Sequence, residues 1–314
     1  MNDALGIHVA CNLCGADEPE TLYDALPLVR CRRCGLAYVD PQPSDEALAA
    51  VYGEDYFTTP THAGEPSYIE NREGLEGFFD GRLRRLERLV RPGRLLEVGS
   101  NLGYLLHVAE RRGWTAIGLE LSDFAARYAR EHFSVDIRVA RLEDAGLEAG
   151  SFDAVVMRDV LEHVRDPRGF LQATRRVLRP DGILALSMPN FASLNALLGG
   201  PAWRHLHPEQ HLFQFAPRTI DRLLDKCGFE AIEMTSRYDS PATREVYAAL
   251  TAPAERRRLA LHAALRGDIV FLPLGTTLRR LLRAAAVGLS LAALPFRDRL
   301  SDDILEVHAR RLST

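Results

Sequence analysis

The chain has a single lysine, Lys226, so arginine carries almost every positive charge among its 314 residues. The 39 basic and 43 acidic residues nearly balance, at a formal charge of −4, which argues against a polyanion as the main partner. Long uninterrupted hydrophobic runs, internal repeats and low-complexity tracts are absent, and the first ten residues do not resemble a signal peptide. Because 46% of the residues are hydrophobic, the chain is able to build a sizeable core. We therefore expect a folded, cytoplasmic protein.

Only five cysteines are present, and four of them form two short pairs, Cys11 with Cys14 and Cys31 with Cys34. Each pair has the spacing Cys-x-x-Cys-Gly, which allows a tight turn to direct both sulfurs at one metal ion. The alternatives are two disulfides, which are not expected without a secretory signal, and four ordinary buried thiols. We predict a structural zinc ion on these four cysteines, which would fold a ribbon too small to have its own core. The fifth cysteine, Cys227, is expected in the core.

Strand-like and helix-like segments alternate from residue 93 onward. Buried strands are predicted at 94–98, 115–119, 136–139, 154–157 and 183–188, with helices at 103–112, 122–132 and 167–178 between them. A helix at 217–227 and strands at 229–235 and 304–309 follow. This alternation is typical of right-handed βαβ units on a parallel sheet, so we predict an α/β fold.

The same pattern divides the chain into five parts. They are a zinc-binding unit (1–43), a helical linker or lid (44–92), a core (93–252) with an aromatic, histidine-containing lid insertion (190–216), a basic insertion (253–300) and a final core strand (301–314).

The basic insertion carries nine arginines against three acidic residues. Within it, residues 278–296 have an apolar stripe of leucine and alanine opposite Arg279 and Arg283, which is typical of an amphipathic helix. We interpret the insertion as helical and packed on the core or in a homodimer contact. The alternative is an interfacial helix, which would place the protein at the inner face of a membrane. A nucleic-acid surface is not expected, since lysine is nearly absent.

A glycine-containing loop follows the first core strand. Gly99 and Gly103 lie between that strand and the next helix, where an adenosine-type ligand is able to lie across the strand ends. Glu120 ends the second strand, in position to accept both ribose hydroxyls. Glu97 lies inside the first strand, where an unpaired charge is costly, and a cationic amino group on the cofactor would compensate it. The pattern favours S-adenosylmethionine over NAD.

Further motifs occur in order along the chain: Cys31-Arg-Arg-Cys-Gly-Leu-Ala-Tyr-Val-Asp-Pro-Gln-Pro, the loop Glu97 to Gly103, Gly118-Leu-Glu120, Ser151-Phe-Asp153, Asp159-Val-Leu-Glu-His163, Leu178-Arg-Pro-Asp-Gly182 and Pro208-Glu-Gln-His211. Together they resemble class I S-adenosylmethionine-dependent methyltransferases, in the branch with an N-terminal zinc-binding unit (methyltransferase type 23-like), over about residues 8–236 and the final strand. The resemblance implies a Rossmann-like seven-stranded methyltransferase sheet with a small N-terminal zinc ribbon and a helical C-terminal insertion.

The resemblance also implies a set of cofactor-binding residues. The methionine part would be contacted by Glu97, Gly99, Ser100, Asn101 and Gly103, and the ribose by Glu120 and Leu121. The adenine would be contacted by Leu142 and Glu143, and the wall of the pocket would be formed by Arg158 and Asp159. The loop motif Gly-Ser-Asn-x-Gly is similar to the corresponding motif of zinc-containing deoxysugar C-methyltransferases. Those proteins use a Glu-His pair where this chain has Gln210-His211.

Methylation of a hydroxyl or a carbon acid needs a base, and an imidazole suits that role near neutral pH. His211 aligns with the catalytic histidine of the C-methyl relatives, and His163 follows the fourth core strand; we predict that one of them is the base. The alternatives are a structural bond between lid and sheet for His211 and helix packing for His163. Glu162 would either complete a relay with His163 or face solvent.

The lid and the linker supply candidates for the acceptor pocket. We predict that Tyr56, Trp203 and His207 contact the substrate; packing between the zinc unit and the sheet is the alternative for Tyr56.

We therefore expect methyl transfer from S-adenosylmethionine to a small molecule, at a hydroxyl of a sugar, glycan precursor or specialised metabolite. The alternatives are C-methylation of a keto-sugar or another carbon acid, and methylation of an RNA base, which the near-even charge disfavours. A non-catalytic binding module is the least favoured interpretation, because Glu97, Gly99, Gly103 and Glu120 are all present.

Overall fold

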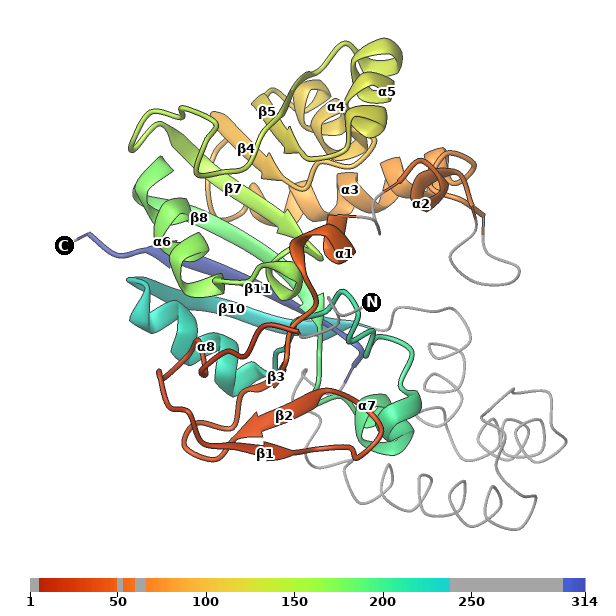
Figure 1. The fold of residues 1–314 in the computed structure, drawn as a ribbon. Coiled ribbons are helices and arrows are strands. Elements are labelled where there is room, and N and C mark those ends of the chain that lie inside the picture. Colours follow the sequence, from red (N-terminus) through yellow and green to blue (C-terminus); the bar gives the residue numbers. More distant parts are fainter. Residues whose placement is uncertain (1–5, 50–52, 60–65, 238–301, 314) are drawn as a thin grey trace, which may run out of the picture.

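A seven-stranded main sheet organises the chain, whose computed structural model describes residues 6–49, 53–59, 66–237 and 302–313 (Figure 1). Its strands are β4 (Arg94–Val98), β5 (Thr115–Glu120), β6 (Asp136–Val139), β7 (Phe152–Arg158), β8 (Leu178–Pro189), β10 (Phe229–Arg237) and β11 (Ile304–Arg311). They lie in the order β10-β11-β8-β7-β4-β5-β6. β4 pairs in parallel with both β5 and β7, so the loops after these strands meet at one edge of the sheet.

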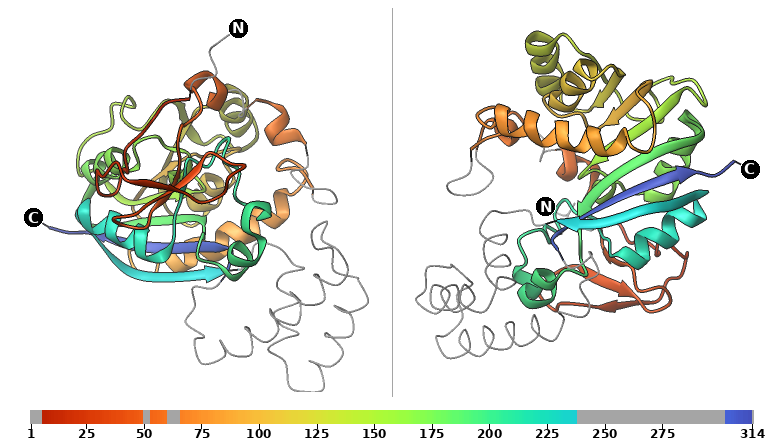
Figure 2. Two further views of the ribbon diagram at one scale, coloured as in Figure 1. Left: turned by 60° about the horizontal axis from the view of Figure 1, so that its bottom comes forward. Right: turned by 180° about the vertical axis from the view of Figure 1, so that it is seen from behind.

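Helices cover both faces of the main sheet (Figure 2). One face packs against α3 (Arg72–Leu86), α4 (Tyr104–Arg111) and α5 (Asp123–Phe133), and the other against α6 (Pro167–Val177) and α8 (Pro217–Lys226). Successive side chains of β4 point to opposite faces of the sheet. Leu95 packs on the face covered by α3, α4 and α5, while Leu96 and Val98 pack on the face covered by α6 and α8. A strand buried on both faces is hydrophobic at successive positions, as Leu95, Leu96 and Val98 are, and Glu97 is the buried exception.

Local signals fix the helix starts. The Ser122 hydroxyl accepts a hydrogen bond from the backbone N–H of Ala125 and begins α5. Asp166 does the same for Gly169 at the start of α6, where Pro167 occupies the first helical position. The predicted strands and helices of the core are confirmed, with their ends shifted by a few residues.

The last strand departs from the expected parallel arrangement. β11 lies between β8 and β10 and pairs antiparallel with both, so the parallel arrangement of the βαβ units does not extend to this strand. Leu305, Val307 and Ala309 are buried on it, and a central strand has this pattern in either direction. The pattern of buried residues therefore does not predict the direction of β11.

The N-terminal unit and the lid insertion share a second sheet. β1 (Pro19–Thr21), β2 (Leu28–Cys31) and β3 (Ala37–Val39) pair antiparallel, and β9 (Phe213–Gln214) of the lid adds to β3. The lid also contains α7 (Leu194–Gly199) and the 3-10 turn η3 (Gly200–Ala202), while α1 (Asp45–Ala49) and α2 (Asp55–Thr58) lie in the linker. Two parts that the sequence separates are thus joined by backbone hydrogen bonds.

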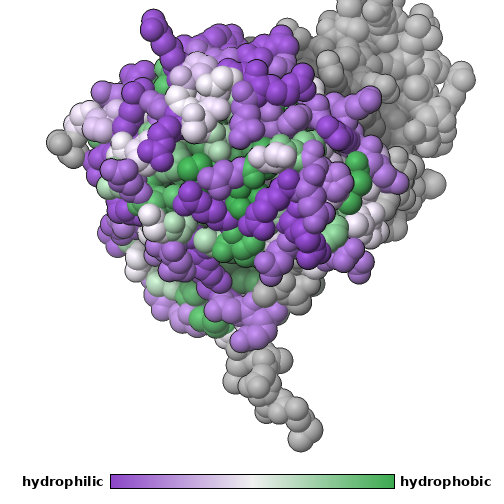
Figure 3. All heavy atoms as spheres, turned by 90° about the horizontal axis from the view of Figure 1, so that it is seen from above, coloured by the Kyte–Doolittle hydropathy of each residue, from purple (hydrophilic) through white to green (hydrophobic). Residues whose placement is uncertain are grey.

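The predicted basic insertion 253–300, with its 278–296 helix, lies outside the described residues. In the part of the chain that is described, no helix combines the length and the apolar character needed to cross a membrane. Figure 3 shows one face of the molecule, on which hydrophilic side chains predominate and interrupt the hydrophobic groups.

Candidate active site

Backbone conformation shapes the loop after β4. Gly99, Asn101 and Gly103 have φ values of 74°, 49° and 79°, in the left-handed region. A Cβ at Gly99 would lie 2.6 Å from the Val160 side chain, so glycine lets this loop touch the loop after β7. A Cβ at Gly103 would lie 2.7 Å from that of Ala129 on α5. Gly103 therefore serves helix packing, a reason that the sequence did not indicate.

Glu97 is a buried carboxylate with an unused oxygen. Its residue is 3% exposed, and Oε2 has no hydrogen-bond partner among the described residues. Burial raises the pKa of this carboxyl well above its ordinary value, against the opposing effect of Arg158. An unpaired buried carboxylate is costly, so the site fits a ligand that brings a positive charge.

Glu120 at the end of β5 holds the two neighbouring loops. Its Oε2 accepts the backbone N–H of Asn101 at 2.8 Å, and its Oε1 accepts those of Leu121 and Ser122 at 2.8 and 2.9 Å. Ser100, also in the predicted set, is buried and donates to the carbonyl oxygen of Glu97. The first glycine loop and the end of β5 thus form one hydrogen-bonded unit.

The remaining predicted cofactor residues lie on the loops after β5, β6 and β7. Leu142 is buried, Glu143 is exposed, and Leu121 is 58% exposed although it is apolar. Arg158 pairs with Asp159 at 3.2 Å, and Asp159 has a φ of 51°. These residues follow neighbouring strands, as a ligand across the strand ends requires.

Glu162, His163 and His211 form a buried cluster. The first two belong to the 3-10 turn η2 (Leu161–His163) after β7, and His211 precedes β9 in the lid. Each offers one ligand or proton-accepting atom, and these atoms lie within 4.8 Å of one another. Glu162 is 1% exposed, so the alternative that it faces solvent is wrong.

Hydrogen bonds to carbonyl oxygens fix both imidazoles. Nδ1 of His163 lies 3.0 Å from the carbonyl oxygen of Gln210, and Nδ1 of His211 lies 2.7 Å from that of His205. Because a carbonyl only accepts, Nδ1 carries the proton and Nε2 carries the lone pair of each neutral ring. Burial lowers the pKa of His163 to about 4 and that of His211, with a further effect of His163, to about 3. Both rings are therefore neutral at pH 7.

Acidification will destabilise the protein through these histidines. Their pKa is 6.5 in an unfolded chain and about 4 and about 3 in the fold, so between pH 7 and pH 5 the unfolded state takes up protons that the folded state does not. The contribution of the two neutral rings to the free energy of unfolding is fully present above pH 6.5. It decreases as the pH falls, by about 2 kcal/mol for each ring at pH 5. Thermal unfolding of the wild type and of His211→Asn at the two pH values measures this. An equal loss of Tm in both proteins would contradict the neutral burial of His211.

The predicted acceptor residues differ in their surroundings. Tyr56 stacks on Tyr68, and the His207 ring centroid lies 5.5 Å from that of His211. Trp203 is 5% exposed, its Nε1 donates to Asp303, and its ring belongs to a buried cluster that joins the lid to Leu28 and Val39 of the N-terminal sheet. His207 is thus in ring contact with the cluster.

A separate cavity of about 500 Å³ lies between the N-terminal unit and the lid. Pro27, Val39 and Pro41 line one side, and Pro208 and Glu209 line the other. None of its lining residues belongs to the loops after β4, β5 or β7.

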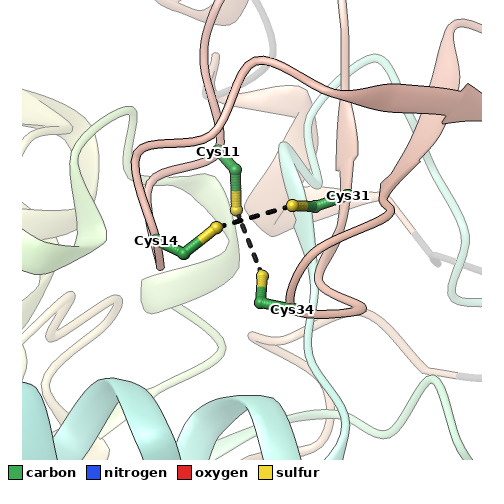
Figure 4. Close-up of side chains that lie close together, drawn as sticks. All are labelled: Cys11, Cys14, Cys31 and Cys34. Atoms are coloured by element: carbon green, nitrogen blue, oxygen red, sulfur yellow. Dashed lines mark hydrogen bonds between the residues drawn. The ribbon is translucent and has the colours of Figure 1, made fainter.

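The four paired cysteines converge (Figure 4). Sγ of Cys11 lies 3.4 Å from that of Cys34, Sγ of Cys14 lies 3.5 Å from that of Cys31, and all four are within 4.8 Å of one another. These distances are too long for a disulfide, about 2.05 Å, and close to the roughly 3.8 Å between sulfurs around tetrahedral zinc. The backbone N–H of Gly15 and of Gly35 closes each turn onto the first cysteine of its pair.

Sequence reasoning missed Asp303 and Tyr68. Asp303 is 1% exposed and accepts hydrogen bonds from Ser193, Asn195 and Trp203, which ties the lid to the start of β11. Tyr68 accepts a bond from the Tyr104 hydroxyl at its backbone oxygen. Neither has a local sequence signal, because their partners lie far along the chain.

Comparison with known proteins identifies the family. Residues 68–234, slightly more than half of the chain, match the family model Methyltransf_23, described as a methyltransferase domain. The chain belongs to this family, as the motifs predicted, and its fold is that of the class I S-adenosylmethionine-dependent methyltransferases. The predicted Rossmann-like, seven-stranded fold is confirmed.

Individual relatives are more distant. Ubiquinone biosynthesis O-methyltransferase of Xanthomonas campestris pv. campestris is 38% identical over 110 residues, which are 33% of this chain and 46% of that protein. The match thus spans about half the length of that curated relative. The protein of the same name from Thiobacillus denitrificans is 30% identical over 163 residues, 48% of this chain and 70% of the relative.

Two solved structures share the fold. A SAM-dependent methyltransferase from Archaeoglobus fulgidus has a TM-score of 0.50 at 16% identity, covering 77% of this chain and 99% of its own. Phosphoethanolamine N-methyltransferase 2 from Haemonchus contortus, solved with S-adenosyl-L-methionine, has a TM-score of 0.52 at 17% identity, covering 88% of this chain and 62% of its own.

Proposed function

We propose that this chain transfers a methyl group from S-adenosylmethionine to a hydroxyl oxygen of a small molecule, such as a sugar, glycan precursor or specialised metabolite. The observation that carries the proposal is the buried Glu162–His163–His211 cluster beside the glycine loop. Its two neutral imidazoles would be able to accept the proton that an acceptor hydroxyl loses. The relatives named as O-methyltransferases support oxygen as the acceptor atom.

The residues of the first loops fit the cofactor. S-adenosylmethionine supplies a methyl group on a positively charged sulfur. Transfer of this methyl group depends on aligning the acceptor atom with it more than on covalent catalysis. The unpartnered oxygen of buried Glu97 fits the cofactor's ammonium group, and the carboxylate of Glu120 fits the ribose hydroxyls. Leu142 and Glu143 would flank the adenine, and Leu121 would lie beside Glu120 at the ribose. Ser100 and Asn101 would contact the methionine part of the cofactor, and Arg158 and Asp159 would line the pocket.

The histidines would act on the acceptor. Each Nδ1–H is held by a carbonyl, so each ring presents the lone pair of Nε2, the form in which an imidazole accepts a proton. We assign proton removal to this pair, with His211 on the lid as the first candidate and His163 as the second. His207, Tyr56 and Trp203 are proposed on the acceptor side, with His207 in closest contact with the pair.

We also propose that Cys11, Cys14, Cys31 and Cys34 hold a structural zinc ion. The sulfur distances and the glycine-closed turns match a four-thiolate site, and such a site has no open position for catalysis. A site of this kind needs reduced thiols, which supports a cytoplasmic location.

Calorimetric titration with S-adenosylmethionine tests the cofactor site. We expect micromolar binding by the zinc-loaded wild type, no signal with NAD, and affinity lowered by about 10- to 100-fold in Glu120→Ala, since hydrogen bonds to a charged group are lost. Glu148→Ala, on an exposed loop, is the matched control and is expected to bind normally.

Methyl incorporation into hydroxylated small molecules, followed by mass spectrometry, tests the reaction, with RNA as the competing acceptor. Normal cofactor binding by Glu120→Ala would refute the assigned ribose contact. Methylation of RNA alone would refute the small-molecule proposal.

A further inference from the structure

The cavity between the N-terminal unit and the lid lies outside the loops that would hold the cofactor. Its volume of about 500 Å³ is within the range of small-molecule sites, about 300–1,000 Å³. Four prolines, Val39 and Ala47 form most of its wall. The polar side chains on the wall are those of Gln42, Ser44 and Glu209, so the described residues that line the cavity include no basic side chain.

The lid wall of this cavity continues into the proposed base. Pro208 and Glu209 line the cavity, and Gln210 and His211 follow them directly in the chain. The segment is tightly turned, since the backbone N–H of His211 donates to the carbonyl oxygen of His207 at 2.7 Å. The Glu209 carboxylate lies 3.1 Å from Nδ1 of His207, whose ring contacts that of His211. One short segment therefore supplies both a wall of the cavity and the proposed base.

The opposite wall is held to the turn that carries His163. Arg165, two residues after His163, donates from Nη1 to Oε1 of Gln42 at 3.1 Å and from Nε to Asp45 at 2.6 Å. It also donates to the carbonyl oxygen of Pro43. Because Asp45 begins α1, this helix lies beside the turn that follows β7 (Figure 1). Both walls are thus fixed to segments that carry the two histidines, and this position suits a molecule that extends from the histidines into the cavity.

The polar groups on the wall indicate the charge of the ligand. Glu209 is the ionisable side chain on the described lining, and it would repel a phosphate or carboxylate that finds no cation beside it. Gln42 is 0% exposed, and its Nε2 has no hydrogen-bond partner among the described residues, although its Oε1 accepts from Arg165. A buried amide N–H without an acceptor is costly, so an uncharged oxygen of a ligand would relieve this cost. The proline rings suit an apolar body.

We propose that this cavity binds the part of the acceptor that lies away from the methylated hydroxyl, and that this part is uncharged and largely apolar. The inference rests on the proposed function, because it names the class of acceptor that the same histidines would serve. Hydroxylated aromatic or aliphatic metabolites fit the cavity. Nucleotide-linked sugars do not, because their phosphates would find no basic side chain on the described lining.

Fluorescence titration of the zinc-loaded full chain with two dyes tests the cavity. N-phenylnaphthylamine is uncharged, and anilinonaphthalene sulfonate has the same rings with one added negative charge. We expect the wild type to bind the uncharged dye at one site with micromolar affinity, and the sulfonate about tenfold more weakly. Ala47→Phe adds a ring to the cavity from an exposed position on α1 and should weaken binding of the uncharged dye by about tenfold or more.

Two further variants separate the cavity from general effects on the fold. Ala202→Phe is the matched control, because it adds the same ring at an exposed lid position that does not line the cavity, and it should bind both dyes as the wild type does. Glu209→Gln removes the charge of an exposed residue without changing its size, and should reduce the preference for the uncharged dye.

Methyl-transfer kinetics connect the cavity to the acceptor. With a hydroxylated small molecule that the wild type methylates, the uncharged dye should raise the KM for that acceptor and leave kcat and the affinity for S-adenosylmethionine unchanged. Equal binding of the uncharged dye by the wild type and Ala47→Phe, or a preference for the sulfonate, overturns the proposal. Dye binding without competition against the acceptor also overturns it. Methylation of no hydroxylated small molecule would instead overturn the proposed function, a result on which the dye titration does not depend.

Discussion

His211→Asn will lower turnover by about a hundredfold or more and leave the affinity for S-adenosylmethionine almost unchanged. The substitution removes Nε2, the atom that we propose accepts the proton of the acceptor hydroxyl. It keeps an amide N–H near Nδ1, so the bond from residue 211 to the carbonyl oxygen of His205 is preserved. A structural effect on the lid is thereby separated from a chemical one.

Steady-state kinetics and calorimetric cofactor binding measure the two parts of this prediction. His132→Asn is the control, because His132 is exposed on α5, away from the cluster, and should retain turnover. Wild-type turnover in His211→Asn would show that His211 is not the base. A parallel loss of cofactor affinity would mean that His211 supports the pocket and not the reaction.

Loss of the zinc ion that we propose on the four cysteines will unfold the N-terminal unit while the main sheet persists. Structural zinc contributes about 10–16 kcal/mol in small metal-dependent domains, and the strands β1, β2 and β3 are three to four residues long. Because β9 pairs with β3 and the backbone N–H of Val39 donates to Leu212, the lid will lose its register at the same time. We therefore expect Cys31→Ser to abolish turnover and to preserve most of the cofactor affinity.

Zinc content, hydrogen exchange of residues 28–39 and cofactor binding measure this result. Cys227→Ser is the matched control: Cys227 is buried near Arg168, outside the four-sulfur cluster, and its replacement should leave the zinc content at one per chain. Full exchange protection of residues 28–39 in zinc-free protein would contradict a structural role for the metal.

The sequence was informative where the signal is local. Two Cys-x-x-Cys-Gly pairs predicted the convergence of four sulfurs, since glycine at the closing position dictates the turn. The capping residues Ser122 and Asp166 gave the starts of α5 and α6, and the buried run 94–98 gave β4. The position of Glu97 within that buried run predicted a cationic ligand from the sequence alone.

Contacts between distant segments were decided by the tertiary structure alone. The direction of β11, the addition of β9 to β3 and the bonds of Asp303 to the lid join residues far apart in the chain. The meeting of Glu162 with His211 belongs to the same class, because 49 positions separate them and neither sequence neighbourhood specifies the other. Local sequence fixes backbone conformation and the pattern of burial, whereas the partner of a buried polar group is chosen only when the elements pack.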